Sequence, residues 1–254
     1  MNRLPLLHKK PSRTSPPVIA NEACSIPAAC HMYFAPLHYE PNYPYPLVIW
    51  LHGPHDNENQ LKKVMPLISM RNYVGAAPRA TALSEEDDGS QICFVWREDD
   101  RNLQFAQERL WECIDGARQR FSICAQRVFL AGLECGGTMA LRLALSNPDQ
   151  FAGALSFGGP FPDDRAPLAR LHAARRIPFF FATTAQSTHY PQAMVCQHLR
   201  LFHSAGMSVT LRQYPGADGL TTLMLSDMDR WIMEHITATP PYPAGDLLEQ
   251  RSVN

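Results

Sequence analysis

The amino-acid sequence predicts an α/β protein in which a mostly parallel central sheet is flanked by helices on both faces. Two observations support this class. Short, nearly continuous apolar runs, suited to strands that are buried on both faces, recur along the chain. They alternate with stretches of roughly 10–15 residues in which apolar residues recur at helical spacing. The 254 residues are 45% hydrophobic, which is enough for one sizeable core or at most two small ones.

Charge and hydropathy argue against several classes of partner. The chain has 23 Lys and Arg residues and 24 Asp and Glu residues, so its formal charge is −1. A nearly neutral chain has no overall attraction for phosphate backbones or anionic lipids, so we expect neither a nucleic-acid nor a membrane partner. No apolar run approaches the ~20 residues that span a bilayer. Residues 1–17 include basic residues but no apolar region follows them, so we expect no signal peptide.

Cysteine usage predicts the compartment. The seven cysteines are widely spaced and no two of them form a CxxC pair, which argues against a zinc ribbon or a thioredoxin-type site. Together with the expected absence of a signal peptide, this pattern predicts reduced, mostly buried thiols in a cytoplasmic protein. We expect the protein to use no cofactor.

The first elements are predicted from composition and from apolar runs. Residues 1–30 are rich in Pro, Ser and Asn and are interpreted as an N-terminal arm that precedes a domain over residues 31–238. Residues 30–38 alternate weakly and predict an edge strand. Leu47–Leu51 is a continuous apolar run that predicts a strand buried on both faces, and Tyr73–Ala77 is a second short run.

The rest of the chain alternates between helix and strand. After an acidic stretch at residues 84–90, interpreted as a solvated loop, Asn102–Phe121 places apolar residues on one helical stripe. Arg127–Ala131 predicts a strand, and Gly136–Leu145 predicts a helix of small residues that ends before Pro148. Further strands are expected at residues 153–157, 177–182 and 208–213, further helices at 192–205 and 220–236, and a proline-containing surface tail at 239–254.

A strand, a glycine turn and a helix of small residues follow one another over Val128–Ala140. Within this segment, Gly132–Gly136 reads Gly-Leu-Glu-Cys-Gly. It is similar to the G-x-S-x-G nucleophile elbow, in which glycines allow a strained turn to lift one side chain above the sheet. Leu51–Gly53 resembles the oxyanion loop of small carboxylesterases. Residues 147–153 and 213–216 resemble the segments that follow the nucleophile helix and precede the catalytic His in those enzymes.

Residues from about Tyr39 to Ile236 therefore resemble the phospholipase/carboxylesterase branch of the α/β-hydrolase superfamily, also called the acyl-protein thioesterase type. The resemblance implies an α/β-hydrolase fold. It also implies a nucleophile at the elbow, an acid after a later strand and a His before the last helix.

The three residues that should react are replaced. In register with the elbow pattern, the nucleophile position is occupied by Glu134 instead of Ser. The position of the catalytic His is best aligned with Asp218. The acid should lie in the loop after the strand predicted at residues 177–182, but this loop contains no carboxylate, and Ser187 stands closest to the position.

The oxyanion hole is also incomplete. One backbone N–H donor in such a hole is worth about 2.7–4 kcal/mol in acyl transfer. The donor after the nucleophile is Cys135, and it keeps its N–H. The other donor of the family follows His52 and Gly53, and here that residue is Pro54, which has no N–H. The resemblance implies that His52 supports this loop by hydrogen bonding.

These losses predict a catalytically degenerate homologue of small carboxylesterases and phospholipases, retained as a binding or interaction scaffold. We expect its partner to be an unidentified small ligand or a protein, and a homodimer is one such assembly. A basic stretch that contains Arg170, Arg175 and Arg176 could form a small anion-binding face or a solvated surface.

The residues leave an active hydrolase open in three forms. Glu134 could be a nucleophile, as the elbow Asp of haloalkane dehalogenases and epoxide hydrolases is, but hydrolysis of the resulting ester needs a His base. Cys135 could act like the elbow Cys of dienelactone hydrolases, although it stands one residue late; its place at a helix start could lower the pKa of its thiol. Glu134 and Asp218 could also hold a metal, with His52 and His55 on the adjacent loop.

Overall fold

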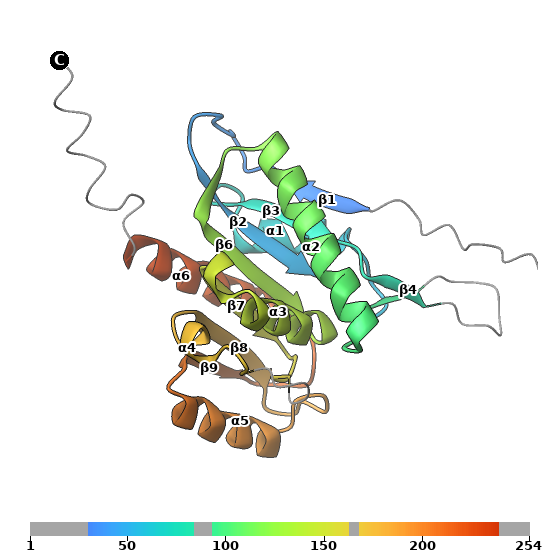
Figure 1. Cartoon of the computed structure of the whole chain (residues 1–254), viewed down its shortest axis with the longest axis vertical. Helices are drawn as coiled ribbons and strands as arrows, with labels where there is room; N and C mark the ends of the chain where they lie inside the picture. Colours follow the sequence, from blue (N-terminus) through green and yellow to red (C-terminus); the bar gives the residue numbers. More distant parts are fainter. Residues whose placement is uncertain (1–29, 84–92, 163–167, 239–254) are drawn as a thin grey trace, which may run out of the picture.

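A sheet of seven strands lies between two layers of helices in the computed structural model, which describes residues 30–83, 93–162 and 168–238 (Figure 1). The strand order is β1-β3-β2-β6-β7-β8-β9. Strand β1 is antiparallel to β3, and the other neighbours are parallel. The predicted fold class, a mostly parallel sheet flanked by helices on both faces, is confirmed.

The elements follow one another in the order that the sequence predicts. The strands of the main sheet are β1 (His31–Phe34), β2 (Tyr45–Leu51), β3 (Val74–Pro78), β6 (Ile123–Leu133), β7 (Gly153–Phe157), β8 (Pro178–Thr184) and β9 (Ser208–Tyr214), and a small separate sheet contains β4 (Thr81–Leu83) and β5 (Cys93–Val95). The helices are α1 (Gln60–Ile68), α2 (Asp100–Arg120), α3 (Cys135–Ser146), α4 (Leu171–Ala174), α5 (Gln192–Ala205) and α6 (Thr222–Ala238), with a 3-10 turn at Pro148–Gln150.

The sheet buries both of its faces. Helices α2, α3 and α5 cover one face, and α1 and α6 cover the other (Figure 1). Successive side chains of β8 alternate between the two layers, so that Phe181 stacks on Phe202 of α5 whereas Phe180 packs against Trp231 of α6. This two-sided burial explains why the strands form continuous apolar runs in the sequence.

Helix α1 is the longest element that the sequence pattern did not predict. Pro66 lies inside it, and a proline usually ends a helix. In the structure, Leu61, Val64, Met65 and Ile68 are buried at helical spacing on the α6 side of the sheet, and this packing outweighs the effect of the proline. Elements β4, β5 and α4 were also not predicted, because each has only three or four residues and shows no period.

Some predictions fall partly or wholly outside the described residues. The acidic stretch at residues 84–90, the C-terminal tail at 239–254 and all but the last residue of the arm at 1–30 lie there, so the domain bounds remain predictions. The six cysteines within the described ranges are free thiols, but only Cys113 and Cys124 are buried, so the expectation of mostly buried thiols is wrong for them. No helix in these ranges is both long and apolar enough to cross a membrane.

Candidate active site at the carboxyl edge of the sheet

Glu134 occupies the tip of a sharp turn between β6 and α3. Its backbone has φ of 48° and ψ of −114°, in a region that residues other than glycine rarely adopt. Its N–H donates to the Phe157 carbonyl of β7 at 2.8 Å, and its own carbonyl accepts from the Thr138 N–H of α3 at 3.0 Å. The turn is thus fixed from both sides, and it lies at the carboxyl edge, the edge of the sheet where the parallel strands end.

Two glycines allow this turn to form. A Cβ atom added at Gly132 would lie 2.4 Å from the carbonyl group of Gly136, and one added at Gly136 would lie 2.3 Å from the carbonyl oxygen of Leu51. Strand β6, helix α3 and strand β2 therefore meet backbone to backbone, which only glycine permits. The geometry is the strained strand–turn–helix connection that the glycine spacing predicts.

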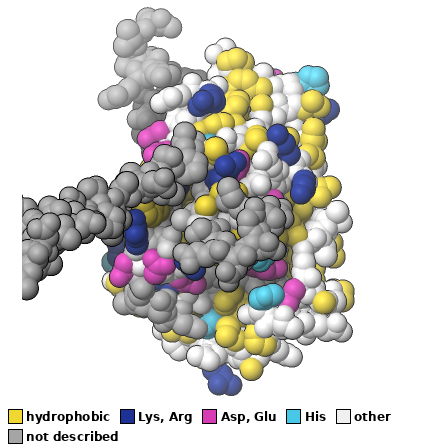
Figure 2. Space-filling view, turned by 90° about the vertical axis from the view of Figure 1, so that its right-hand side faces the viewer, with side chains coloured by type: hydrophobic (Ala, Val, Ile, Leu, Met, Phe, Trp, Pro, Cys, Tyr) yellow, Lys and Arg dark blue, Asp and Glu magenta, His cyan; other side chains and the backbone are white. Residues whose placement is uncertain are grey.

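Within the residues that the structure describes, no group of opposite charge pairs with the Glu134 carboxylate. The side chain is half-buried, and within the described residues it makes no hydrogen bond and no ion pair. Figure 2 shows the side of the molecule toward which β2 and β6 point in Figure 1, where acidic, basic and His side chains are interspersed among apolar ones. No imidazole of the described residues is hydrogen-bonded to Glu134.

Asp218 lies in a separate polar cluster on the same edge. Its Oδ2 accepts from the Thr188 N–H and hydroxyl, each at 2.8 Å, and lies 3.2 Å from Nδ1 of His189. Its Oδ1 lies 3.4 Å from the Thr184 hydroxyl. Burial acts to raise the pKa of Asp218, but hydrogen bonds from Ser187, Thr188 and His189 outweigh it and hold this pKa well below its usual range.

The structure brings Ser187 and Asp218 into hydrogen-bond contact. No hydrogen bond or ion pair in the described ranges joins this cluster to Glu134. His189, which sequence reasoning missed, is the imidazole of the cluster and is 60% exposed. In the sequence, only its position two residues after Ser187 connects His189 with the candidate site. Its contact with Asp218, 29 positions away, depends on the fold.

The loop after β2 uses its polar groups for its own structure. His52 is completely buried; its Nδ1 donates to the Gly53 carbonyl at 2.8 Å, and its Nε2 accepts from the Ala80 N–H at 3.2 Å. Burial lowers the pKa of His52, which keeps the ring neutral. Both ring nitrogens are occupied, so His52 supports the loop and is not positioned as a metal ligand.

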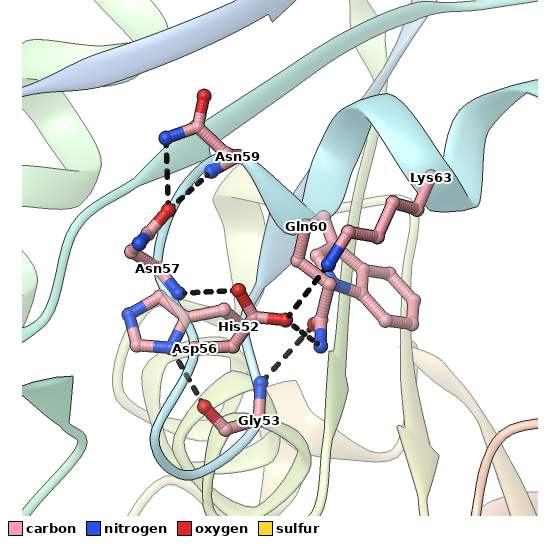
Figure 3. A network of polar contacts seen from close by, with 8 residues as sticks. His52, Gly53, Asp56, Asn57, Asn59, Gln60 and Lys63 are labelled. Atoms are coloured by element: carbon pink, nitrogen blue, oxygen red, sulfur yellow. Dashed lines mark hydrogen bonds and ion pairs between the residues drawn. The ribbon is translucent and has the colours of Figure 1, made fainter. Parts of the chain in front are cut away.

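Gln60 connects this loop to α1 (Figure 3). Its Oε1 accepts from Nε1 of Trp50 at 2.6 Å and from the Gly53 N–H at 3.1 Å, and its Nε2 donates to Asp56 at 3.0 Å. The Gly53 N–H is therefore already bonded, and Pro54 has none. Neither Gly53 nor Pro54, in the segment that resembles an oxyanion loop, has a backbone N–H left to donate to a substrate oxygen.

The N–H of Cys135 is the donor that remains. Cys135 begins α3, where a backbone N–H has no partner within the helix. Its thiol does not have the lowered pKa that its position at a helix start suggested. Burial raises the pKa of this thiol, and the opposing hydrogen bonds from the backbone of Trp96 and Gly136 are weaker. Cys135 is thus a protonated, half-buried thiol.

A thiol and an imidazole that sequence reasoning did not pair also lie on this edge. Nδ1 of His55 is 3.5 Å from Sγ of Cys93 at the start of β5. His55, like Glu134, has a positive φ, of 58°. The two residues are 38 positions apart, so only the fold brings them into contact. Within the described residues, no three His, Cys, Asp or Glu side chains are grouped to hold a metal ion.

Comparisons with known proteins agree with this architecture. A family described as "Putative esterase" matches residues 25–213. A carboxylesterase of Bacillus cereus is similar with a TM-score of 0.65 at 17% identity, covering 82% of this chain and 95% of that chain. SOBER1 of Arabidopsis thaliana has a TM-score of 0.62 at 17% identity, covering 76% of this chain and 99% of its own. No curated protein sequence matches. At these identities the solved structures establish the fold alone, and the predicted α/β-hydrolase fold is confirmed.

Replacing Gln60 with Leu should destabilise the loop. The variant leaves the buried donors of Trp50 and Gly53 without an acceptor, so the free energy of unfolding should fall by about 2–4 kcal/mol. Urea denaturation measures the loss. Asn59→Ala is the matched control. The Asn59 side chain bonds Asn57 alone among the described residues, so the loss of stability should stay below about 1 kcal/mol. Equal losses in the two variants would contradict the role of Gln60.

Replacing Asp218 with Asn should lower stability in a pH-dependent way. The lowered pKa of Asp218 means that its carboxylate stabilises the fold above the pKa of an unfolded Asp, about 3.9, and that this stabilisation is lost as the pH falls further. We expect a loss of ~1–2 kcal/mol at neutral pH, because Thr188 and His189 lose a charged acceptor. Between about pH 6 and pH 3 the difference from the wild type should shrink.

Urea denaturation at a series of pH values checks this expectation. Asp115→Asn is the control, since its carboxylate is 66% exposed and meets only Arg118 on the same helix. The control should change stability by less than about 0.5 kcal/mol throughout. An Asp218→Asn effect that is constant across the pH range is incompatible with a stabilising carboxylate at this position.

Proposed function

The chain belongs to the esterase family, and on that premise we propose that it is a catalytically degenerate homologue of small carboxylesterases. It would keep the hydrolase scaffold to bind a small ligand or a protein partner, a second copy of the chain included. The observation that supports this most strongly is Glu134, which occupies the elbow tip where the family presents an alcohol and has no imidazole bonded to it within the described residues.

The requirements of acyl transfer support this proposal. A serine nucleophile is activated by a His within hydrogen-bond reach, and the His is oriented by an acid. Here the carboxylate at the His position, Asp218, bonds Thr188 and His189 instead. One oxyanion donor is worth roughly 100- to 1,000-fold in turnover, and of the two family donors only the Cys135 N–H is left.

A hydrolase that uses Glu134 as its nucleophile is the second candidate. One observation favours it: the contact between His189 and Asp218 provides a carboxylate-oriented imidazole near the former His position. Such a pair is what hydrolysis of a glutamyl ester would require. Against this candidate, the described residues show no contact between His189 and Glu134. A metal-dependent version has less support, because no metal-holding group of side chains occurs in the described ranges.

Esterase assays with p-nitrophenyl acetate and p-nitrophenyl butyrate distinguish these candidates. We expect the wild type to hydrolyse neither ester faster than Glu134→Ala or the nearly isosteric Glu134→Gln, because no activated nucleophile is available at the elbow. Wild-type turnover at least tenfold above both variants would overturn the degenerate assignment. If His189→Ala then removed that turnover, while His172→Ala at an exposed helical position did not, the second candidate would replace it.

A further inference from the structure

A cavity of about 270 Å³ lies at the amino edge of the sheet, the edge where the parallel strands begin. Tyr45 and Pro46, the first residues of β2, line it together with Asn72, which stands two residues before β3, and with Ile236 near the end of α6 (Figure 1). Glu134 follows the last residue of β6 and lies at the opposite edge. This tyrosine cavity is thus separate from the candidate active site, and what it binds does not depend on the function proposed for that site.

Tyrosine rings hold the loop before β2 in place beside the cavity. The ring of Tyr45 stacks on that of Tyr39 with the centroids 5.4 Å apart, and it meets the ring of Tyr43 edge to face at 4.7 Å. The Tyr45 hydroxyl accepts from the Glu40 N–H at 3.2 Å, and the Tyr43 N–H donates to the Glu40 carbonyl at 3.1 Å. These contacts fix the backbone of Glu40, so its carboxylate extends from a fixed point of the loop.

Part of the cavity lining is apolar. Tyr45 and Ile236 are each less than a tenth exposed, and Met233 and Pro46 add further apolar surface. Sites for drug-sized ligands have volumes of roughly 300–1,000 Å³ and combine such surfaces with a few polar groups. A volume of about 270 Å³ therefore suits a smaller molecule with a short apolar body.

Two side chains of opposite charge line the same cavity. Glu40 contributes a carboxylate from the loop before β2, and Arg71 contributes a guanidinium from the loop between α1 and β3. Both residues are exposed, and within the described ranges neither side chain forms a hydrogen bond or an ion pair, with each other or with a third group. Both charges are therefore left to meet a ligand that occupies the cavity.

A second carboxylate close to the cavity is already bonded. Asn72 lines the cavity, and its Nδ2 donates to Oδ1 of Asp229 at 3.3 Å. The Tyr73 hydroxyl donates to the same oxygen at 2.7 Å, and Asp229 itself does not line the cavity. Among the lining residues that the structure describes, Glu40 is the one acid and Arg71 the one base.

We propose that the tyrosine cavity binds a free α-amino acid with an apolar side chain. Its α-carboxylate meets Arg71, and its α-ammonium group meets Glu40. Its side chain contacts Tyr45, Met233 and Ile236. A zwitterion suits this cavity better than an ion of one sign, because a simple anion or cation would leave one of the two protein charges without a partner. A ligand without an apolar side chain would leave the apolar lining uncovered.

Isothermal titration calorimetry at pH 7 with L-leucine and three analogues tests the proposal. L-leucinamide lacks the carboxylate, N-acetyl-L-leucine lacks the ammonium group, and glycine lacks the side chain. We expect saturable binding of L-leucine with a Kd below about 1 mM, and binding of each analogue at least about fivefold weaker, because each analogue lacks one of the three contacts.

Two substitutions assign the charged contacts to their residues. Arg71→Gln should weaken L-leucine binding about fivefold and remove the preference over L-leucinamide. Glu40→Gln should weaken it by a similar factor and remove the preference over N-acetyl-L-leucine. Arg200→Gln on α5 and Glu108→Gln on α2 are the matched controls, since both residues are exposed and do not line the cavity, and each should leave the Kd within about twofold.

The outcomes that would overturn the proposal are specific to this cavity. They are no saturable binding of L-leucine, equal affinity for L-leucine and any one of the analogues, or effects of the Arg71 and Glu40 substitutions no larger than those of their controls. Melting temperatures check that the variants fold, and the analogue series, which needs no variant, decides alone if one does not. None of these results would alter the assignment at Glu134.

Discussion

The backbone of Glu134 is the constraint on which the arrangement of the carboxyl edge depends. Non-glycine residues in such conformations are strained by about 1–3 kcal/mol and persist only when their surroundings fix them. Here the hydrogen bonds to Phe157 and Thr138, and the backbone contact of Gly132 with Gly136, fix the turn. The strained turn is thus present with a carboxylate, and not an alcohol, at its tip.

Polar groups on the loops of this edge form hydrogen bonds within the protein. Gln60 accepts from the N–H of Gly53, and His52 bonds the Gly53 carbonyl and the Ala80 N–H. The Asp218 carboxylate accepts from its neighbours on the β8–α5 loop. Each of these hydrogen bonds stabilises the fold, because a buried polar group without a partner costs about 1–3 kcal/mol. Their joint effect is that, within the described residues, no hydrogen bond joins Glu134 to an imidazole.

Sequence reasoning was most successful where local patterns determine structure. The glycine spacing at Gly132 and Gly136 placed the elbow, and continuous apolar runs placed the strands, since both depend on residues next to each other in the chain. Helix α1 could not be predicted, because Pro66 lies inside it and only the tertiary packing shows that the helix continues past this proline. The pKa of the Cys135 thiol was predicted in the wrong direction, because burial outweighs the effect of the helix start.

Contacts between distant segments explain what the sequence could not predict. The approach of His189 to Asp218, and that of His55 to Cys93, each requires loops that the fold brings together. A cavity of about 430 Å³ is likewise lined by residues of β6, β8, β9 and α6, which are far apart in the sequence. Charged residues such as Arg170 and Arg176 are equivalent in the sequence, and only their positions show that one of them lines the cavity.

Peptide mapping by mass spectrometry after incubation with a p-nitrophenyl ester tests most directly whether the carboxyl edge lacks a nucleophile. The structure predicts that no acyl group is found on the peptides that contain Glu134, Ser187 or Cys93. Stoichiometric acylation of any one of these residues in the folded chain would show that the edge contains an activated nucleophile and would contradict the central claim.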